Sequence, residues 1–171
     1  MKILIIGGNG TIGTKVSHHF SKKHEIIIGG RNSGEVTVDI AESKSIEAMF
    51  ESIGTLDAVV CIAGEAKWAP FDAMVEEDFY FGLKSKLMGQ VNLVRIGQKY
   101  LNAGGSFTLT TGILADHPVM LTTSPAMVNG AIHSFVKAAA LELENGIRIN
   151  VVSSGLVEDA IDKYEAFFPE R

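Results

Sequence analysis

Three glycines near the start of the chain, Gly7, Gly10 and Gly13, have the spacing of a loop that holds phosphate. They follow the short apolar run 3–6 and precede a segment whose apolar residues recur at helical spacing. In such a strand–loop–helix unit the first glycine permits a tight turn, the second lets the backbone approach a pyrophosphate, and the third lets the helix pack close to the strand. Free N–H groups at the helix start then bind the phosphate charge. The pattern favours a dinucleotide-binding loop over a glycine-rich turn without a ligand, with predicted contacts at Gly7, Asn9, Gly10, Thr11, Ile12 and Gly13.

A basic residue follows the second apolar run, where a dinucleotide site discriminates between NAD and NADP. An NAD site places Asp or Glu after the second strand, where the carboxylate accepts hydrogen bonds from the ribose hydroxyls. Here the run 26–28 is followed by two glycines and then by Arg31, Asn32 and Ser33, with no acid among them. The Arg31 guanidinium can make a paired, charge-assisted contact with a 2′-phosphate, and Asn32 and Ser33 add donors. The segment therefore favours NADP(H), with a solvated surface arginine as the alternative.

Apolar runs and helical segments alternate along the chain, and these elements must position the glycine loop and the basic residue. Short continuous apolar runs are typical of strands buried on both faces of a parallel sheet. Ser43 and Gly54 are predicted to cap a helix between the third and fourth strands. The alternation predicts an α/β fold with a doubly wound parallel sheet, a Rossmann fold, in a single three-layer αβα domain over residues 1–171. The predicted strands cover residues 2–6, 25–28, 35–38, 56–62, 106–111 and 147–152, and the two longest helices cover residues 76–101 and 126–143.

Composition narrows the classes of partner. A net charge of −5 argues against a nucleic-acid partner, and no run approaches the ~20 apolar residues of a membrane-spanning helix. The single cysteine, Cys61, excludes an internal disulfide framework and a cysteine zinc cluster, and it favours a reducing, cytoplasmic setting. The five histidines are scattered apart from one adjacent pair, and no metal site is predicted.

The segment 126–143 is apolar on almost every side, so a single sheet cannot cover all of it. In a chain of 171 residues the simplest second cover is another copy, which predicts a homodimer or homotetramer. In the preceding helical segment, Gly82, Ser85 and Gly89 share one face. Small residues there permit close packing either against the sheet or against a partner helix, and the sequence leaves both open.

Five further segments resemble the short-chain dehydrogenase/reductase family over nearly the whole chain. Asp39-Ile40 resembles the adenine contact of that family, and Ala63-Gly64 resembles the end of its Asn-Asn-Ala-Gly stretch. The segment 86–89 is similar to the helical Asn-x-x-Gly, the segment 105–111 to the strand before the catalytic serine, and the segment 147–155 to the Ile-Arg-Val-Asn…Pro-Gly segment. The resemblance implies the Rossmann fold and a nicotinamide cofactor, with Asp39, Ile40, Ala63 and Gly64 as further contacts.

The same resemblance implies four catalytic positions, and the residues at those positions differ from the family. Alignment of the helix 126–143 places Pro125 where the family has its proton-transferring Tyr and Asn129 where it has the Lys that lowers the pKa of that Tyr. Thr111 is the best match to the Ser, although counting back from Pro125 points to Gly112, and Lys86 replaces the Asn. Thr111 and Lys86 are therefore the candidate catalytic residues.

Two other residue pairs could transfer the proton. A literal Tyr-x-x-x-Lys exists at Tyr80 and Lys84, but it lies in the wrong helix and is interpreted as coincidence. Asp116 and His117, in the loop after the fifth predicted strand, could act as acid and base, although adjacency before Pro118 favours a role in the turn.

These residues predict an NADP(H)-dependent oxidoreductase of the short-chain type with a non-classical active site and an unknown small-molecule substrate. Flavins and quinones would suit it, because they need no Tyr proton donor. The alternative is a non-catalytic NADP(H)-binding redox sensor or regulatory protein, which the replaced Tyr and Lys favour. Whether the protein is an enzyme stays open at this point.

Overall fold

The computed structural model describes residues 1–161 and contains one six-stranded parallel sheet. The strand order β3-β2-β1-β4-β5-β6 reverses direction at β1, which creates a crevice at the carboxyl ends of β1 and β4. The predicted Rossmann-type α/β fold is thereby confirmed. The strands are β1 (Lys2–Ile6), β2 (Glu25–Gly30), β3 (Val36–Thr37), β4 (Leu56–Cys61), β5 (Leu101–Gly112) and β6 (Arg148–Ser154).

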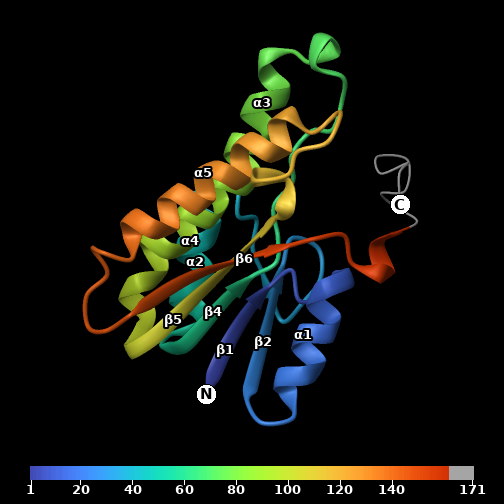
Figure 1. The fold of residues 1–171 in the computed structure, drawn as a ribbon. Coiled ribbons are helices and arrows are strands. Elements are labelled where there is room, and N and C mark those ends of the chain that lie inside the picture. Colours follow the sequence, from blue (N-terminus) through green and yellow to red (C-terminus); the bar gives the residue numbers. More distant parts are fainter. Residues whose placement is uncertain (162–171) are drawn as a thin grey trace.

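Helices cover both faces of the sheet (Figure 1). On one face, Val16 and Phe20 of α1 (Thr11–Ser21) pack on Ile3 and Ile5 of β1. The other face carries the larger core, in which Phe50 and Phe107 are fully buried. That core is built by α2 (Ser43–Ile53), α4 (Gly89–Gly97) and α5 (Thr123–Ala139). Among the described residues, no helix is long and apolar enough to cross a membrane.

The segment predicted as one long helix, 76–101, is helical to residue 100 but not regular. It consists of α3 (Glu76–Gly82), a π-helical turn (Leu83–Met88), α4 and a 3-10 turn (Gln98–Tyr100). Gly82 and Gly89 bound the π-helical turn, and each lies against a neighbour in the same chain. A Cβ on Gly82 would lie 3.0 Å from Ser124 Oγ, and one on Gly89 would lie 3.0 Å from Ile40 Cδ1. Gly82 and Gly89 therefore allow this segment to pack closely against other residues of the same chain.

Most remaining differences from the predicted bounds fall at element ends. β5 begins at Leu101, because Leu101 pairs with Leu56 of β4. After this pair the register between β4 and β5 shifts. α5 begins at Thr123, since Pro125 fits the first helical turn, where its missing N–H is not needed. The helix ends at Ala139, after which bonds such as Leu141 N–H to Ala138 O tighten the chain into turns. Gly54 caps α2 as predicted, whereas Glu42 takes the N-cap position expected for Ser43.

Candidate functional site

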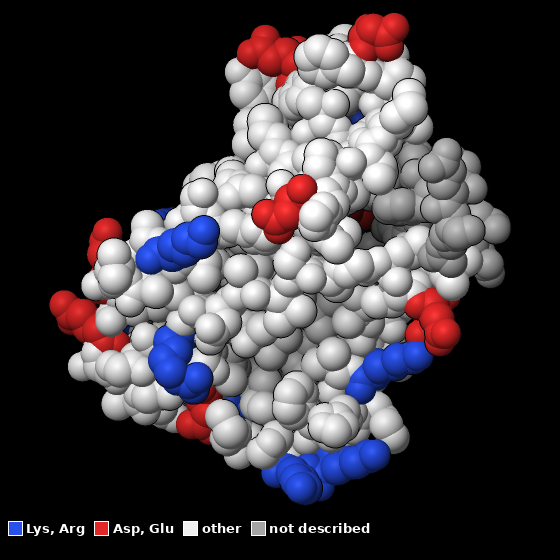
Figure 2. All heavy atoms as spheres, viewed as in Figure 1, with Lys and Arg blue, Asp and Glu red and all other residues white. Residues whose placement is uncertain are grey.

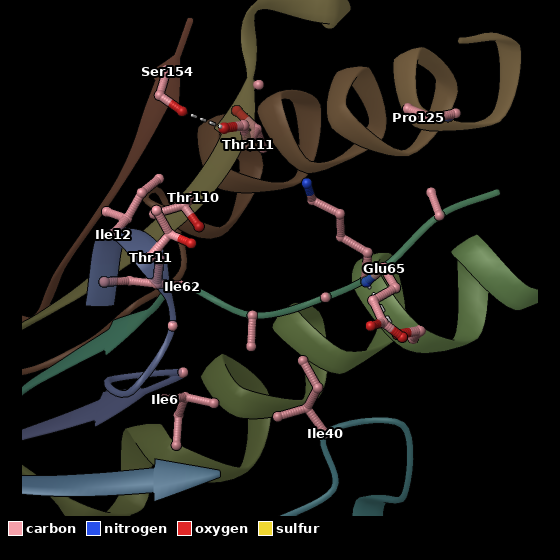
Figure 3. Close-up of a pocket in the computed structure, with 18 of the residues that line it drawn as sticks. Ile6, Thr11, Ile12, Ile40, Ile62, Glu65, Thr110, Thr111, Pro125 and Ser154 are labelled. Atoms are coloured by element: carbon pink, nitrogen blue, oxygen red, sulfur yellow. Dashed lines mark hydrogen bonds between the residues drawn. The ribbon is translucent and has the colours of Figure 1, made fainter. Parts of the chain in front are cut away.

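A cleft of about 970 Å³ opens at the carboxyl ends of the central strands. Figure 3 shows Thr11 and Ile12, at the start of α1, on one side of this cleft, and Glu65 and Pro125 on the other. Of the fifteen predicted site residues, Gly13 and Asn32 alone are outside its lining. The other thirteen line it: Gly7, Asn9, Gly10, Thr11, Ile12, Arg31, Ser33, Asp39, Ile40, Ala63, Gly64, Lys86 and Thr111.

The glycine loop has the backbone geometry that its residue types predict. Gly7 has φ +80°, and a Cβ there would lie 2.6 Å from Ile62 O. A Cβ on Gly13 would lie 2.0 Å from Gly7 O, so Gly13 lets α1 approach β1 and does not itself face the cleft. Gly10 is the N-cap of α1, and its N–H donates to Gly7 O at 3.0 Å. The loop leaves a cradle beside the N-terminus of α1 that a side chain would fill.

The loop after β2 brings Arg31 and Ser33 to the rim of the cleft. Arg31 Nη2 lies 3.8 Å from Glu65 Oε2, and both side chains are 59% exposed. No sequence signal indicated Glu65, which follows Gly64 in the loop after β4. Asp39 is held by a hydrogen bond from Ala41 N–H to its Oδ1 at 3.0 Å.

The loop after β4 is tied to β5 by a buried glutamine that the sequence did not indicate. Gln90 of α4 donates through Nε2 to Ala63 O at 3.2 Å and to Thr110 O at 2.9 Å. Its Oε1 is buried and has no hydrogen-bond partner within the described residues. Gln90 thus fixes the spacing between the ends of two neighbouring strands. The only available signal was a polar residue directly after Gly89 on a helix face that is otherwise packed.

Lys86 lies on the π-helical turn and lines the cleft. It stands against Gly64, where a Cβ would lie 2.8 Å from Lys86 Cγ and 2.9 Å from Lys86 Cα. Burial lowers the pKa of the Lys86 ammonium, and the nearby Cys61 thiol opposes this effect weakly. Burial also raises the pKa of that thiol to about 11, so Cys61 is neutral near pH 7. Within residues 1–161, Lys86 has no ion pair and no hydrogen bond.

Thr111 directs its hydroxyl towards α5. Its Oγ1 lies 2.8 Å from Nε2 of His133, and the residue is 5% exposed. Ser154 Oγ donates to Thr111 O at 3.5 Å, the bond drawn in Figure 3. The sequence carries no signal that connects His133 with the site, since a contact between a strand end and a helix position one turn beyond Asn129 has no local signature.

Gly112, Pro125 and Asn129 lie together in the part of the cleft where β5 meets α5. Asn129 Nδ2 donates to Gly112 O at 3.3 Å, and a Cβ on Gly112 would lie 3.3 Å from the same nitrogen. Asn129 is 2% exposed, and its Oδ1 has no partner within the described residues. Position 112, rather than 111, is therefore the one that faces Asn129.

The other candidate proton groups lie outside the cleft lining. Tyr80 is exposed and donates to Glu76 Oε1 at 2.5 Å, and Lys84 is exposed and pairs with Glu42 at 2.6 Å. Asp116 and His117 follow a 3-10 turn, where both N–H groups donate to Ile113 O. Neither pair lines the cleft.

The chain is similar over nearly its whole length to a family model and to solved structures. The family model described as enoyl-(acyl carrier protein) reductase matches residues 12–169. The solved structure of lin1944 from Listeria innocua is 47% identical over the whole of this chain and 86% of its own, with a TM-score of 0.98. A small-chain dehydrogenase solved in complex with NADPH is 29% identical over 98% of this chain and 78% of its own, with a TM-score of 0.87.

Two curated proteins with different names are also similar to this chain. Dihydropteridine reductase of Dictyostelium discoideum is 28% identical over 94% of this chain and 74% of its own length. The short-chain dehydrogenase/reductase ucsE of an Acremonium species is 31% identical over 60% of this chain, a match that spans 39% of ucsE. With a family model that matches nearly its whole length, the chain belongs to the short-chain dehydrogenase/reductase family.

Proposed function

We propose that the protein is an NADP(H)-dependent oxidoreductase whose reacting end differs from the classical arrangement. The observation that carries the proposal is the cleft itself, because the glycine loop, Arg31 and the ends of β4 and β5 line one continuous space. A volume of about 970 Å³ is at the upper end of the range of roughly 300–1,000 Å³ for cofactor and ligand sites. The relative solved with NADPH supports the choice of cofactor.

The residues present fit such a cofactor. The cradle at Gly7, Asn9, Gly10, Thr11 and Ile12 would take the pyrophosphate at the start of α1, and Gly13 would keep that helix close to β1. Asp39 and Ile40 would contact the adenine, and Ala63 and Gly64 the middle of the dinucleotide. The cofactor supplies hydride-transfer chemistry when bound, and the protein binds and orients it.

Arg31 would select the 2′-phosphate of NADP(H). Ser33 lies beside it in the lining, and Asn32 follows it on the loop outside. The ion pair with Glu65 is long and exposed, and such pairs contribute about 0–1 kcal/mol. A phosphate can therefore displace Glu65 from Arg31 at little cost. The absence of an acid at 31–33 leaves no carboxylate there to favour the ribose hydroxyls of NAD.

At the reacting end, Thr111 and Lys86 are the proposed catalytic residues. The contact of Asn129 with Gly112 supports the alignment in which Gly112, Pro125 and Asn129 occupy the positions of the family's Ser, Tyr and Lys. None of the three carries a hydroxyl or an ionisable group. Lys86 is the ionisable side chain that could replace them, since it lines the cleft and has no ion pair or hydrogen bond within residues 1–161. The reaction would suit substrates that need no Tyr proton donor, such as quinones or flavins.

A non-catalytic NADP(H)-binding protein is the second candidate. Three positions favour it: Gly112 and Pro125 offer no side-chain donor, and the hydroxyl of Thr111 is engaged with His133. Such a protein would bind NADPH through the same cradle and show no turnover. It would act as a redox sensor or regulatory partner.

A second copy of the chain is proposed to cover α5, in a cytoplasmic homodimer or homotetramer. Met127 is 41% exposed on this helix, and a Cβ on Gly130 would meet nothing within 4 Å. Figure 2 shows that the face of the molecule around α5 carries few charged side chains. Light scattering at micromolar concentration should give at least twice the monomer mass, and a clean monomer would refute the assembly.

Titration with NADPH and NADH, followed by turnover assays on ketones, quinones and flavins, tests the proposed function. Preferential NADPH binding with turnover of any acceptor supports the oxidoreductase. Preferential binding without turnover of any acceptor supports the sensor, and absence of NADPH binding contradicts both.

A further inference from the structure

Two basic side chains, Arg31 and Lys86, line the cleft within residues 1–161, and they differ in their surroundings. Arg31 is at the exposed rim and faces Glu65. Lys86 is half-buried and faces no carboxylate of residues 1–161. The ionisable neighbour that it has there is the thiol of Cys61, which is neutral near pH 7. A partly desolvated cation without a counter-charge is unfavourable, and an anion that enters the cleft would relieve this cost.

The position of Lys86 is fixed by the backbone on both sides of it. The residue lies on the π-helical turn Leu83–Met88, a type of helical irregularity that is frequent at functional sites. The start of its side chain lies against Gly64, whose φ of +123° and lack of Cβ leave the room for it. A larger residue at position 64 would displace the lysine. Its charged end therefore projects from a defined place on the cleft wall rather than from a free surface helix.

A second, independent group in the same cleft lacks a partner. Asn129 Oδ1 is buried and accepts no hydrogen bond within the described residues, although Nδ2 of the same side chain donates to Gly112 O. A buried acceptor without a donor is costly, and a donor on a ligand that enters the cleft would offset this cost if the Asn129 side chain turns towards it. The side chains of Pro125, Ile113 and Leu114 add apolar surface to this end of the cleft. A cation, an acceptor and apolar walls thus line one cleft.

We propose that this end binds an aromatic oxyanion, a phenolate or a ring carboxylate, whose charged oxygen is held by Lys86. A hydroxyl donor on the same ligand would satisfy Asn129 Oδ1, and the ring would lie against the apolar walls. This proposal rests on the proposed function in one respect, since the aromatic oxyanion would be the substrate on which the NADP(H)-dependent oxidoreductase acts. An aliphatic ketone lacks both the charge and the ring, so it would gain little from either side chain.

The test is a binding titration of 4-nitrocatechol, whose absorbance reports its phenolate form and whose second hydroxyl is a donor. Saturable binding to the unmodified protein is expected, with a loss of about tenfold or more in Lys86→Met, since a charge-assisted hydrogen bond is removed. Lys86→Arg should retain most of the affinity because it keeps the cation. Lys84→Met is the matched control, because Lys84 is exposed and paired with Glu42 outside the cleft lining, and its affinity should equal that of the unmodified protein.

Three further ligands distinguish the source of the oxyanion and the role of charge. Competition by 3-hydroxybenzoate stronger than that by 4-nitrophenol, which ionises near neutral pH, would identify a carboxylate, and the reverse would identify a phenolate; both keep the role of Lys86. The neutral dimethoxy analogue of 4-nitrocatechol should bind weakly and be indifferent to Lys86→Met. Equal affinity of 4-nitrocatechol for the unmodified protein and Lys86→Met, or no saturable binding at all, would overturn the proposal.

NADPH binding, followed separately by the fluorescence of the nicotinamide, keeps the two proposals distinguishable. Two measurements show that the fold of the Lys86→Met variant is intact. The variant should bind NADPH normally, and its melting temperature should equal or exceed that of the unmodified protein. If NADPH does not bind while the Lys86-dependent 4-nitrocatechol site does, the proposed function fails and the oxyanion site stands. If NADPH binds and the loss in Lys86→Met is absent, the oxyanion site alone fails.

Discussion

The two ends of the cleft are constructed by different means. The cofactor end (residues 7–13, 31–33 and 39–40) depends mainly on backbone geometry, as at Gly13, where a Cβ would lie 2.0 Å from Gly7 O. The reacting end (residues 86, 111–112, 125 and 129) depends on side chains, two of which, Lys86 and Asn129, carry polar groups without partners in the described chain. A backbone cradle tolerates few residue types, whereas a side-chain site can change its residues without a change of fold. The second end is therefore the one at which the proposed differences from the family pattern are expected.

The largest expected effect comes from restoring the classical set at the reacting end. We expect the unmodified protein to reduce simple ketones very slowly, because Gly112, Pro125 and Asn129 supply no proton donor. The combined variant Gly112→Ser, Pro125→Tyr and Asn129→Lys should raise the ketone-reduction rate by about 10²–10⁴-fold, the usual contribution of general acid–base catalysis.

Each of these three substitutions alone should leave the rate near that of the unmodified protein, since the Tyr and Lys act as a unit. Steady-state assays with NADPH over a panel of ketones measure this. A family-typical rate in the unmodified protein, insensitive to Lys86→Met, would show that the alignment of α5 is wrong.

At the cofactor end, Arg31→Ala should weaken NADPH binding and leave NADH binding nearly unchanged. Loss of a charge-assisted hydrogen bond corresponds to about 1.5–3 kcal/mol, or roughly 10- to 150-fold in Kd. Fluorescence titrations of the two cofactors measure both constants. A parallel loss for NADPH and NADH would mean that Arg31 shapes the loop rather than contacts the 2′-phosphate. Glu65→Gln, which removes the competing carboxylate, should strengthen NADPH binding slightly.

The backbone dependence of the cofactor end is tested by Gly13→Ala. The added methyl would lie within 2.0 Å of Gly7 O, so α1 must shift away from β1. We expect a loss of about 1–3 kcal/mol in the free energy of unfolding, the usual cost of overpacking. Gly155→Ala is the control, because a Cβ there would meet nothing within 4 Å among the described residues. Urea denaturation of both variants provides the comparison, and equal losses would contradict the role assigned to Gly13.

The smallest expected effect is a gain in stability from Lys86→Met. Burial lowers the pKa of Lys86 in the folded protein, so the unfolded chain binds this proton more tightly. The resulting cost is fully present below the folded pKa and disappears as pH rises through the ordinary lysine pKa of 10.5. Lys86→Met should therefore raise the free energy of unfolding at pH 7 by about 1 kcal/mol, the lower end of a burial penalty. Urea denaturation at pH 7 and near pH 10 should show the gain shrinking; a gain independent of pH would exclude charge burial as its cause.

The sequence predicts the fold and the glycine loop for the same physical reason: each requires particular residue types at particular positions. The parallel sheet and the cradle at Gly7 and Gly13 follow from that constraint, whereas the strand order comes from the structure. Predicted element ends are less accurate, as at Leu101 and Ala139, because pairing with β4 and tight turns decide them. The contacts of Gln90, His133 and Glu65 could not be predicted, since each joins residues far apart in sequence and no local pattern indicates them.

The most direct test of the account is the pair of dissociation constants of the unmodified protein for NADPH and NADH. An intact cofactor end with Arg31 at its rim predicts that NADPH binds at least about tenfold more tightly, the factor that one charge-assisted contact supplies. Equal affinities for the two cofactors, or tighter binding of NADH, would contradict it.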